Sequence, residues 1–413
     1  MNTGIEKIAV YPGSMALSMP ELVDVRGADR QLVIEQMLID ERSVNPPWED
    51  PVTLAVNAAN RMLTDADRRS IGLLIVATET GLDQEKSLST WVQRYLNLPD
   101  DCRNFEIKIA CYGGSAALFA ARGALSLLPQ NKKVLVITTD VSRKHFGKPY
   151  EFVMGCGAVA FIVSRTPKFF QITNESSAVY TYEVSDLIRP TSRVEAGHSE
   201  TSLLSYLEGI ATTFERYMEQ DERAERYPNL ETFRQAIPYQ IYHAPFSGIT
   251  LRAHKAVHKY FGRLNPEYLK QDYTDNVLPS LQYNRRMGGT YAASVFISMV
   301  GLVDAKGEDV KTRACSIYSY GSGSCAEFYT GVFDNDAPDI AHRCELEKQL
   351  QARKKLTVAE YELAENIRDE LVDQGDFSVP KTGFESWYEQ FYAGQNKLVL
   401  SGATDYVREY AWS

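Results

Sequence analysis

Four short apolar runs rich in β-branched residues divide the chain. They lie at 71–78, 133–140, 239–243 and 315–320. An apolar run of this length without polar alternation is typical of a strand that is buried on both faces of a sheet. Between these runs lie two segments of helix length, 114–128 and 289–303, in which Ala, Ser and Gly are mixed with larger apolar residues. Because neither segment has a continuous polar face, we expect both to be helices buried inside the molecule.

The order of these elements occurs twice. Strand, buried helix, strand, glycine turn and strand follow one another over 71–164 and again over 239–333. The two passes are offset by about 170 to 180 residues, which predicts a duplicated α/β unit rather than unrelated domains. We therefore expect an α/β fold with two similar halves, at 1–170 and 171–413.

Two further segments complete the predicted organisation. Asp50 and Pro51, followed by apolar residues at helical spacing, predict the capped start of an amphipathic helix that covers one face of the sheet. The stretch at about 334–375 is charged and has helical periodicity. We expect it to be a helical insertion that leaves the core and is exposed to solvent.

Composition and charge restrict the classes of binding partner that we expect for this chain. Of the 413 residues, 44% are hydrophobic and 24% charged, as in an ordinary globular protein. The formal net charge is −10 and no dense run of Lys or Arg offsets it, so nucleic acid is not an expected partner. The first ten residues lack a signal-peptide pattern, and no apolar stretch has the roughly 20 residues that cross a bilayer. We expect a cytoplasmic protein without a membrane partner.

Six cysteines are scattered along the chain, at 102, 111, 156, 315, 325 and 344. None of them has the CxxC spacing that zinc and redox sites use, so we expect free thiols and no metal site. A small buried apolar residue is the simplest interpretation of most of them. A functional cysteine has to be identified by its surroundings.

Cys111 has such surroundings, because the sequence ACYGGSAA at 110–117 begins a predicted buried helix. The unpaired amides and positive end of that helix predict a lowered thiol pKa and a nucleophilic thiolate. The two glycines, Gly113 and Gly114, would let a substrate approach closely. A cysteine that only packs is the alternative interpretation.

Glu79 and His243 end equivalent strands of the two predicted halves. Glu79 follows the run 71–78 at the strand end where open α/β sheets bind ligands, so it is a candidate base. His243 ends the run 239–243, and pseudo-symmetry would direct both side chains into one site near Cys111. A solvated loop acid and a structural histidine remain the alternatives. The other histidines, at 145, 198, 254, 258 and 342, are expected to be solvated or to pack.

A glycine-rich loop follows the last predicted strand of the second half. Gly321 and Ser322 begin the sequence GSGS, whose backbone amides could face a developing oxyanion. A tight turn would need the same residues, so the loop sequence alone does not distinguish an oxyanion-binding loop from a simple turn. The pattern GxxxxGK[ST] of a nucleotide phosphate loop is absent.

Together these motifs resemble the 3-hydroxy-3-methylglutaryl-CoA synthase family. The resemblance covers most of the chain and rests on GIEKIAVY, VATET, ACYGGSAALF, IYHAPF and YGSGSCAEF, which occur in the family's order. It implies a thiolase fold with a layered αβαβα arrangement, and a homodimer. It also implies that Glu79 is the general base, Cys111 the acylated nucleophile and His243 the residue that serves the acceptor carbonyl.

The chain departs from the primary-metabolism members at three places. Lysines that usually follow the HxPF motif are missing at 247–252, and the usual Gly-Asn is Gly288-Gly289, so Gly289 leaves out one polar contact in the active site. The segment 189–209 replaces the usual YPLVDG and is similar to homologues that install β-branches on carrier-bound polyketides. We therefore expect an acyltransferase that condenses an acetyl group from acetyl-ACP with the β-ketone of an acyl-ACP. A synthase using acetyl-CoA and acetoacetyl-CoA is the first alternative, and a non-catalytic thioester-binding scaffold is the second.

The expected reaction needs no metal or redox cofactor, because phosphopantetheine thioesters of ACP or CoA deliver the acyl groups. Its expected partners are donor and acceptor acyl carrier proteins, which are acidic. An acidic enzyme needs a local basic face to bind them. The helix after His243 carries the best candidates, Arg252, Lys255 and Lys259, together with His254, His258 and Arg263. An ordinary solvated helix face is the alternative.

Overall fold

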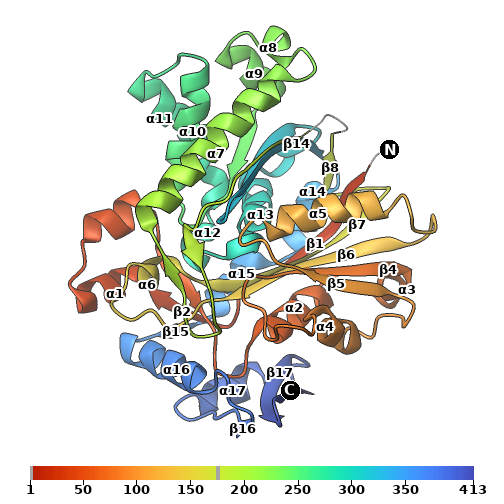
Figure 1. The fold of residues 1–413 in the computed structure, drawn as a ribbon, viewed down its shortest axis with the longest axis vertical. Coiled ribbons are helices and arrows are strands. Elements are labelled where there is room, and N and C mark those ends of the chain that lie inside the picture. Colours follow the sequence, from red (N-terminus) through yellow and green to blue (C-terminus); the bar gives the residue numbers. More distant parts are fainter. Residues whose placement is uncertain (1–2, 174–176) are drawn as a thin grey trace.

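A ten-stranded sheet runs through the computed structural model, which describes residues 3–173 and 177–413 (Figure 1). From one edge to the other, its strands are β12 (Tyr239–Tyr242), β13 (Ala314–Gly321), β14 (Cys325–Phe333), β8 (Phe170–Ile172), β1 (Thr3–Tyr11), β7 (Cys156–Ser164), β6 (Lys133–Val141), β4 (Ile71–Ala77) and β5 (Arg103–Ile107), with β9 (Ala178–Thr181) paired to β14. The four apolar runs are all strands of this sheet, as predicted. The α/β fold class expected from the sequence is confirmed.

The strand pairings repeat between the first and second halves of the chain. In the first half, β4 is parallel to β6 and β6 is antiparallel to β7. In the second half, β12 is parallel to β13 and β13 is antiparallel to β14. The two sets meet at β1, which pairs with both β7 and β8. Equivalent strands of the two halves therefore end in related positions.

The two predicted central helices differ in burial. α13 (Ser294–Lys306) is buried along 294–303, as expected. α5 (Gly113–Ala124) buries one side against β4 and β6 but leaves Phe119 67% exposed. The prediction of a buried helix is therefore wrong for the outer side of α5, because no described element of this chain covers it.

A helix on the opposite side of the sheet is α2 (Pro51–Asn60), which packs on β6 and β7. The side chain of Asp50 accepts from the backbone N–H of Thr53, and the Thr53 hydroxyl accepts from the backbone N–H of Asp50. This capping box satisfies amides that would otherwise lack partners at the helix start. The predicted capped amphipathic helix is confirmed.

The charged segment 334–375 is helical but does not leave the core. Its elements are α14 (Ala337–Arg343), α15 (Leu346–Ala352), β15 (Lys354–Leu356) and α16 (Val358–Glu370). α14 packs on β1 and α13, and Leu346 and Leu350 of α15 are buried in the main core. The expected solvent-exposed excursion is wrong, because each short helix gathers its few apolar residues on one side and buries them.

Smaller elements surround this body. β15 forms a small sheet with β2 (Met15–Ser18) and β3 (Glu41–Val44), and the C-terminal segment forms a sheet of β16 (Phe377–Ser378), β17 (Leu398–Thr404) and β18 (Val407–Trp412). The remaining strands are β10 (Leu187–Ile188) and β11 (Ala196–Gly197). The remaining helices are α1 (Met19–Arg26), η1 (Gln31–Gln36), α3 (Asp65–Ser70), α4 (Ser89–Tyr95), α6 (Tyr150–Val153), α7 (Ser199–Glu219), α8 (Arg223–Arg226), α9 (Leu230–Ala236), α10 (Ile249–Tyr260), α11 (Pro266–Asn276), η2 (Leu278–Leu281), α12 (Asn284–Met287), η3 (Tyr291–Ala293), η4 (Gly307–Val310) and α17 (Glu385–Phe391). Across the described residues, every helix is too short or too polar to cross a bilayer.

Candidate active site

The strand and helix ends bring Glu79 and Cys111 into contact. Glu79 lies just beyond β4, and Cys111 lies two residues before α5. The Cys111 thiol donates a hydrogen bond to Glu79, with 3.5 Å between Sγ and Oε2. Two residues that are 32 positions apart in the sequence thus make the contact that a nucleophile and its base require.

Cys111 is presented by a bent loop. The preceding residue, Ala110, has a left-handed backbone with φ of 43°. A β-carbon at Gly114 would lie 2.5 Å from Cε2 of Phe296 and 2.6 Å from the backbone oxygen of Ala292. Gly114 therefore serves the close packing of α5 against the second half of the chain. The expectation that this glycine makes room for substrate is wrong, because protein atoms already fill that space.

Burial changes the expected ionisation of Cys111. Burial and the neighbouring Glu79 carboxylate raise the pKa of the Cys111 thiol well above its usual value. This direction is opposite to the lowered pKa that the sequence predicts from the helix terminus. A helix terminus stabilises a charge by about 0.3–1 kcal/mol, which is less than the effect that desolvation and a neighbouring carboxylate can have on a partly buried thiol. The resting residue is a neutral thiol.

Asp140 is a site residue that the sequence reasoning missed. Its Oδ1 accepts the backbone N–H of Glu79 at 2.9 Å and the hydroxyls of Thr78 and Thr80 at 3.0 Å each. The buried Asp140 carboxylate thereby positions the turn that presents Glu79. Burial, followed by the charge of Asp140, raises the pKa of Glu79. The sequence did contain a signal for Asp140, because this residue ends the predicted strand 133–140 just as Glu79 follows the predicted strand 71–78. In the structure these two strands are adjacent and parallel, so their ends lie together.

His243 enters the site from the second half of the chain. Its backbone N–H donates to Tyr318 at 2.7 Å, which continues the β12–β13 pairing, and the residue is 2% exposed. The Nδ1 atom lies 2.6 Å from Oγ of Ser294. Burial lowers the pKa of His243 to about 3. The imidazole is therefore neutral at physiological pH.

Cys111 and His243 line one cavity of about 550 Å³. Most of its lining is apolar, and it is formed by η1, α6, α7 and the start of α10. A cavity of this size with few polar groups is typical of a site for a small molecule or an acyl chain. Glu79 lies behind Cys111 and contacts the thiol. Of the two side chains that pseudo-symmetry predicts to share a site near Cys111, His243 lines this cavity, whereas Glu79 does not line it and contacts the Cys111 thiol.

The glycine-rich loop and Gly289 also border this cavity. Ser322 and Gly289 are among the lining residues. A β-carbon at Gly321 would lie 2.6 Å from the backbone nitrogen of Tyr112, so glycine is required where β13 ends against the Cys111 loop. A β-carbon at Gly289 would lie 2.7 Å from the backbone oxygen of Pro245. The loop therefore both turns the chain from β13 into β14 and borders the cavity.

A charged network lies beside Glu79. Arg189, in the segment that distinguishes this chain, donates to Oε2 of Glu195 at 2.9 Å, and His145 Nε2 lies 3.1 Å from the same oxygen. The positive charge of Arg189 opposes the rise in the pKa of Glu79. His145 is buried, in agreement with a packing role. The local sequence did not indicate that Arg189 and Glu195 lie near Glu79, because only the tertiary fold brings 189–195 close to the end of β4.

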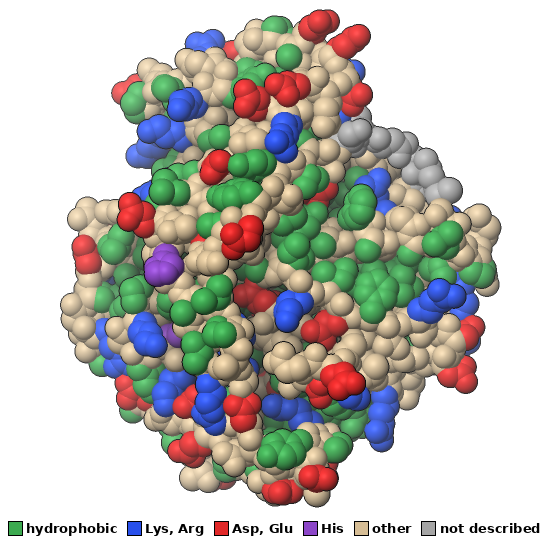
Figure 2. Space-filling view, in the orientation of Figure 1, with side chains coloured by type: hydrophobic (Ala, Val, Ile, Leu, Met, Phe, Trp, Pro, Cys, Tyr) green, Lys and Arg blue, Asp and Glu red, His purple; other side chains and the backbone are tan. Residues whose placement is uncertain are grey.

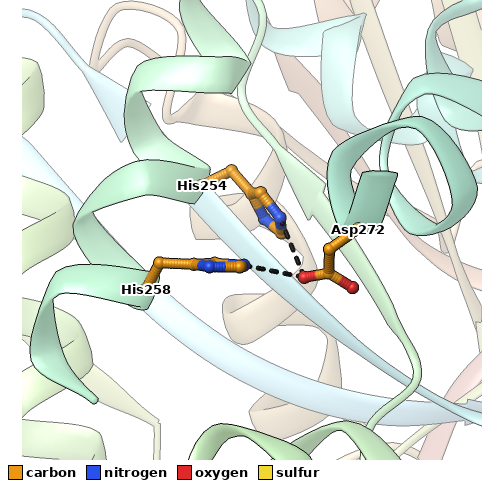
Figure 3. Close-up of side chains that lie close together, drawn as sticks. All are labelled: His254, His258 and Asp272. Carbon is orange, nitrogen blue, oxygen red and sulfur yellow. Dashed lines mark hydrogen bonds and ion pairs between the residues drawn. The ribbon is translucent and has the colours of Figure 1, made fainter. Parts of the chain in front are cut away.

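A second cluster could be mistaken for a metal site. His254 and His258 of α10 both point at Asp272 of α11 (Figure 3), with 3.1 Å and 2.7 Å from their Nε2 atoms to Oδ2. Arg234 forms an ion pair with the same oxygen. A guanidinium at that oxygen repels a metal cation, so these residues fit a charge-balanced polar core better than a metal centre. The interpretation of His254 and His258 as packing residues agrees with this geometry.

The two sides of the proposed docking helix α10 differ in burial. Arg252, Lys255 and Lys259 are exposed on one side, and Arg252 also lines the cavity. His254 and His258 face inward, so they are not part of a basic outer surface. Arg263 is paired with Glu231 at 2.6 Å. The basic surface of this helix is therefore smaller than the sequence predicts.

Known proteins are similar to the whole chain. The family model "Hydroxymethylglutaryl-coenzyme A synthase C terminal" matches residues 253–394. The chain is 34% identical to the polyketide biosynthesis 3-hydroxy-3-methylglutaryl-ACP synthase PksG of Bacillus subtilis (strain 168), covering 100% of this chain and 99% of that protein. It is 29% identical to the hydroxymethylglutaryl-CoA synthase of Enterococcus faecalis, covering 91% and 94%. The HMG synthase of the curacin biosynthetic pathway, in complex with holo donor-ACP, superposes with a TM-score of 0.92 at 34% identity and covers both chains fully.

Proposed function

The chain belongs to the hydroxymethylglutaryl-CoA synthase family, and from this premise we propose that it is an acyltransferase that builds β-branches on polyketides. It condenses an acetyl group from acetyl-ACP with the β-ketone of an ACP-bound intermediate. The product is a 3-hydroxy-3-carboxymethyl acyl-ACP. One observation carries the proposal: the Cys111–Glu79 pair and His243, from opposite halves of a thiolase fold, converge at one largely apolar cavity.

The first step transfers the acetyl group to Cys111. The sulfur attacks the thioester carbonyl, the carrier thiol leaves, and the proton of the Cys111 thiol ends on that leaving thiol. Glu79 Oε2 is in contact with Sγ and is the group placed to take the proton in transit. The raised pKa of Cys111 keeps the resting thiol protonated until a thioester is bound.

The second step forms the carbon–carbon bond. Glu79 removes a proton from the acetyl methyl group, and the enolate carbon attacks the β-ketone of the acceptor. The proposed donors to the enolate oxygen are the backbone amides of Cys111 and Ser322, two residues that line the cavity, and each donor would contribute about 3 kcal/mol. His243 polarises the ketone oxygen. The resulting alkoxide takes up one proton, which balances the proton removed by Glu79.

The last step releases the product. Water adds to the Cys111 thioester carbonyl, the carbon–sulfur bond breaks, and the new carboxyl group leaves with the acceptor chain. The sulfur recovers its proton and the site returns to the resting thiol. The acetyl group arrives on a phosphopantetheine thiol, is held on Cys111 during condensation, and leaves as part of the acceptor chain, which stays on its own phosphopantetheine thiol.

The donor is tested by intact-protein mass spectrometry. The purified protein is mixed with acetyl-ACP or with acetyl-CoA, and the mass increase of one acetyl group on Cys111 is followed in time. We expect acetyl-ACP to react much faster, and the Cys111→Ser variant to gain no acetyl group at the thioester concentrations used. Preference for acetyl-CoA would favour a primary-metabolism synthase. No acetylation with either donor would contradict catalysis and favour a non-catalytic scaffold.

The exposed basic side of α10 is the proposed docking site for the acidic carrier proteins. Lys255 and Lys259 are one helical turn apart and follow Arg252, which lines the cavity. A carrier bound there would lie beside the cavity, so its phosphopantetheine arm could enter. A basic surface offsets the repulsion expected from a net charge of −10.

The proposed assembly is a homodimer. β5 is the last strand of the sheet, so its outer edge is unpaired within the described chain. Apolar side chains gather over α5 and this edge (Figure 2), including Phe105, Ile109, Phe119 and Leu127, which are all exposed. An unpaired strand edge beside exposed apolar residues favours pairing with a second copy through a two-fold axis.

A further inference from the structure

The first residue of α13, Ser294, controls the hydrogen bonding of the catalytic histidine. It is fully buried, and its Oγ lies 2.6 Å from Nδ1 of His243. The same oxygen accepts the backbone N–H of Ala244 at 3.4 Å. A serine hydroxyl has one hydrogen to donate and two lone pairs that accept. The directions of its hydrogen bonds therefore determine where the imidazole proton lies.

The backbone amide of Ala244 can only donate, so Oγ is the acceptor in that contact. Oγ has a second lone pair, but within the described residues the Ser294 hydroxyl has no hydrogen-bond acceptor other than Nδ1 of His243, so its hydrogen points to that nitrogen. An imidazole nitrogen that accepts a hydrogen bond carries no proton. In a neutral ring, the proton must then lie on Nε2.

The surroundings also oppose a charged ring. An imidazolium carries one hydrogen on each ring nitrogen. The hydrogen on Nδ1 would leave the buried hydroxyl hydrogen of Ser294 without an acceptor. Burial lowers the pKa of His243, and no charged group in the described part of the chain opposes this shift. The ring at rest is a neutral donor at Nε2.

We propose that Ser294 is a positioning residue that holds His243 as the neutral Nε2–H tautomer, so that the ring serves the acceptor ketone as a hydrogen-bond donor and not as an acid. This inference rests on the proposed condensation. The donor stabilises negative charge as it develops on the ketone oxygen. The proton that finally joins the alkoxide is the one that Glu79 removed from the methyl group, so the step balances while the ring keeps its own proton.

The tautomer is tested directly by NMR of the protein labelled with ¹⁵N-histidine. The signals of His243 are those missing from a His243→Asn variant. We expect a protonated Nε2 and an unprotonated Nδ1 at neutral pH, and the same pattern at pH 5. A protonated Nδ1, or a doubly protonated ring at neutral pH, would overturn the proposal. This measurement needs no substrate, so it decides the tautomer even if the proposed reaction fails.

The role of Ser294 is tested with Ser294→Ala. We expect the turnover rate of condensation to fall about 10- to 100-fold, as for other groups that orient a functional imidazole, while acetylation of Cys111 stays within about twofold of wild type. Ser294→Thr keeps the hydroxyl and should recover most of the rate. In the NMR spectrum of Ser294→Ala, the fixed tautomer of His243 should give way to a mixture.

Ser298→Ala is the matched control. Ser298 lies one turn further along α13, is equally buried and donates to Asn284 at 3.1 Å, but has no contact with His243. We expect this variant to condense at close to the wild-type rate. A condensation rate of Ser294→Ala that equals wild type, or that falls only as much as in Ser298→Ala, would overturn the proposal. Loss of Cys111 acetylation in the wild-type protein would instead count against the proposed function.

Discussion

Burial governs the chemistry of the individual site residues. Asp140 is buried, Cys111 and Glu79 are partly buried, and each has a raised pKa mainly because its charged form is desolvated. The cluster therefore holds fewer negative charges than its composition implies. A neutral thiol beside a carboxyl group with a raised pKa is a system in which a proton moves over a short distance when substrate arrives.

The first prediction concerns Glu79 as the base. Acetylated enzyme in D₂O should exchange the methyl hydrogens of the Cys111-bound acetyl group, and Glu79→Gln should slow this exchange by at least about 100-fold, because the amide cannot accept the proton. The exchange is measured by mass spectrometry of the acetylated active-site peptide. Exchange at the wild-type rate in Glu79→Gln would mean that another group is the base.

The second prediction concerns the pH dependence of this exchange. Glu79 acts only when ionised, so the rate should fall as the pH drops through its raised pKa, at a higher pH than for an ordinary carboxyl group. Asp140→Asn removes a negative charge but keeps the oxygen that accepts the Glu79 amide. We expect the acidic limb of the profile to move to lower pH in this variant. An unchanged profile would contradict the electrostatic role of Asp140.

At the scale of single elements, α10 has two distinct sides. Its exposed side carries Arg252, Lys255 and Lys259. Its inner side carries His254 and His258, which are held by Asp272 of α11. The buried network joins the two helices, and so it orients the basic side relative to the cavity.

The third prediction concerns the exposed side of α10. Lys255→Glu or Arg252→Glu should raise KM for acyl-ACP about threefold to tenfold, because reversing a surface charge turns a weak attraction into repulsion. Acetylation of Lys255→Glu by a small free thioester should not change. Arg69→Glu is the matched control, because Arg69 is exposed on α3 at the far side of the molecule (Figure 1). An unchanged KM for both α10 variants would remove this helix from the docking model.

The fourth prediction concerns His254 and acid stability. Burial lowers the pKa of His254 to about 4, so the folded protein keeps it neutral while the unfolded chain takes up a proton below about pH 6.5. The free energy of unfolding should therefore fall as the pH drops from about 6.5 towards 4. His254→Gln should make this slope shallower by at most about 1.4 kcal/mol per pH unit, as measured by urea unfolding at several pH values. A uniform loss of stability with an unchanged slope would contradict this assignment.

At the scale of the whole molecule, one surface of the fold remains unpaired. The outer edge of β5 and the outer side of α5 lie next to the loop that carries Cys111, because Ile109 is both exposed and two residues from the nucleophile. A second copy bound there would shield apolar surface and support the Cys111 loop. The incomplete burial of α5 is then explained by the assembly.

The fifth prediction tests this surface. Phe119→Glu should convert the proposed dimer to a monomer, because it places a charge within the proposed apolar contact. The mass in solution is measured by light scattering during size-exclusion chromatography. Val25→Glu is the matched control, since Val25 is 58% exposed on α1, on the opposite side of the molecule (Figure 1). A wild-type protein that is monomeric at micromolar concentration would contradict the dimer model.

Local patterns predicted the main elements and identified the candidate site residues, whose roles came from the family resemblance. The apolar runs predict the main strands, and the repeated order predicts the repeated pairings, because a strand buried on both faces must be apolar throughout. Cys111, Glu79 and His243 are recognisable because each lies at the end of an element, next to an apolar run. The short helices of 334–375 were misjudged because their few apolar residues are diluted by charges.

The sequence by itself therefore determined the fold class, the order of the elements and the positions of the candidate nucleophile, candidate base and histidine. Only the tertiary structure decided the ionisation of these groups, because a pKa depends on burial and on charges that are distant in the sequence. Asp140, Arg189 and Ser294 became site residues for the same reason. Each contacts or acts on its catalytic partner across at least 50 positions, and only packing brings them together.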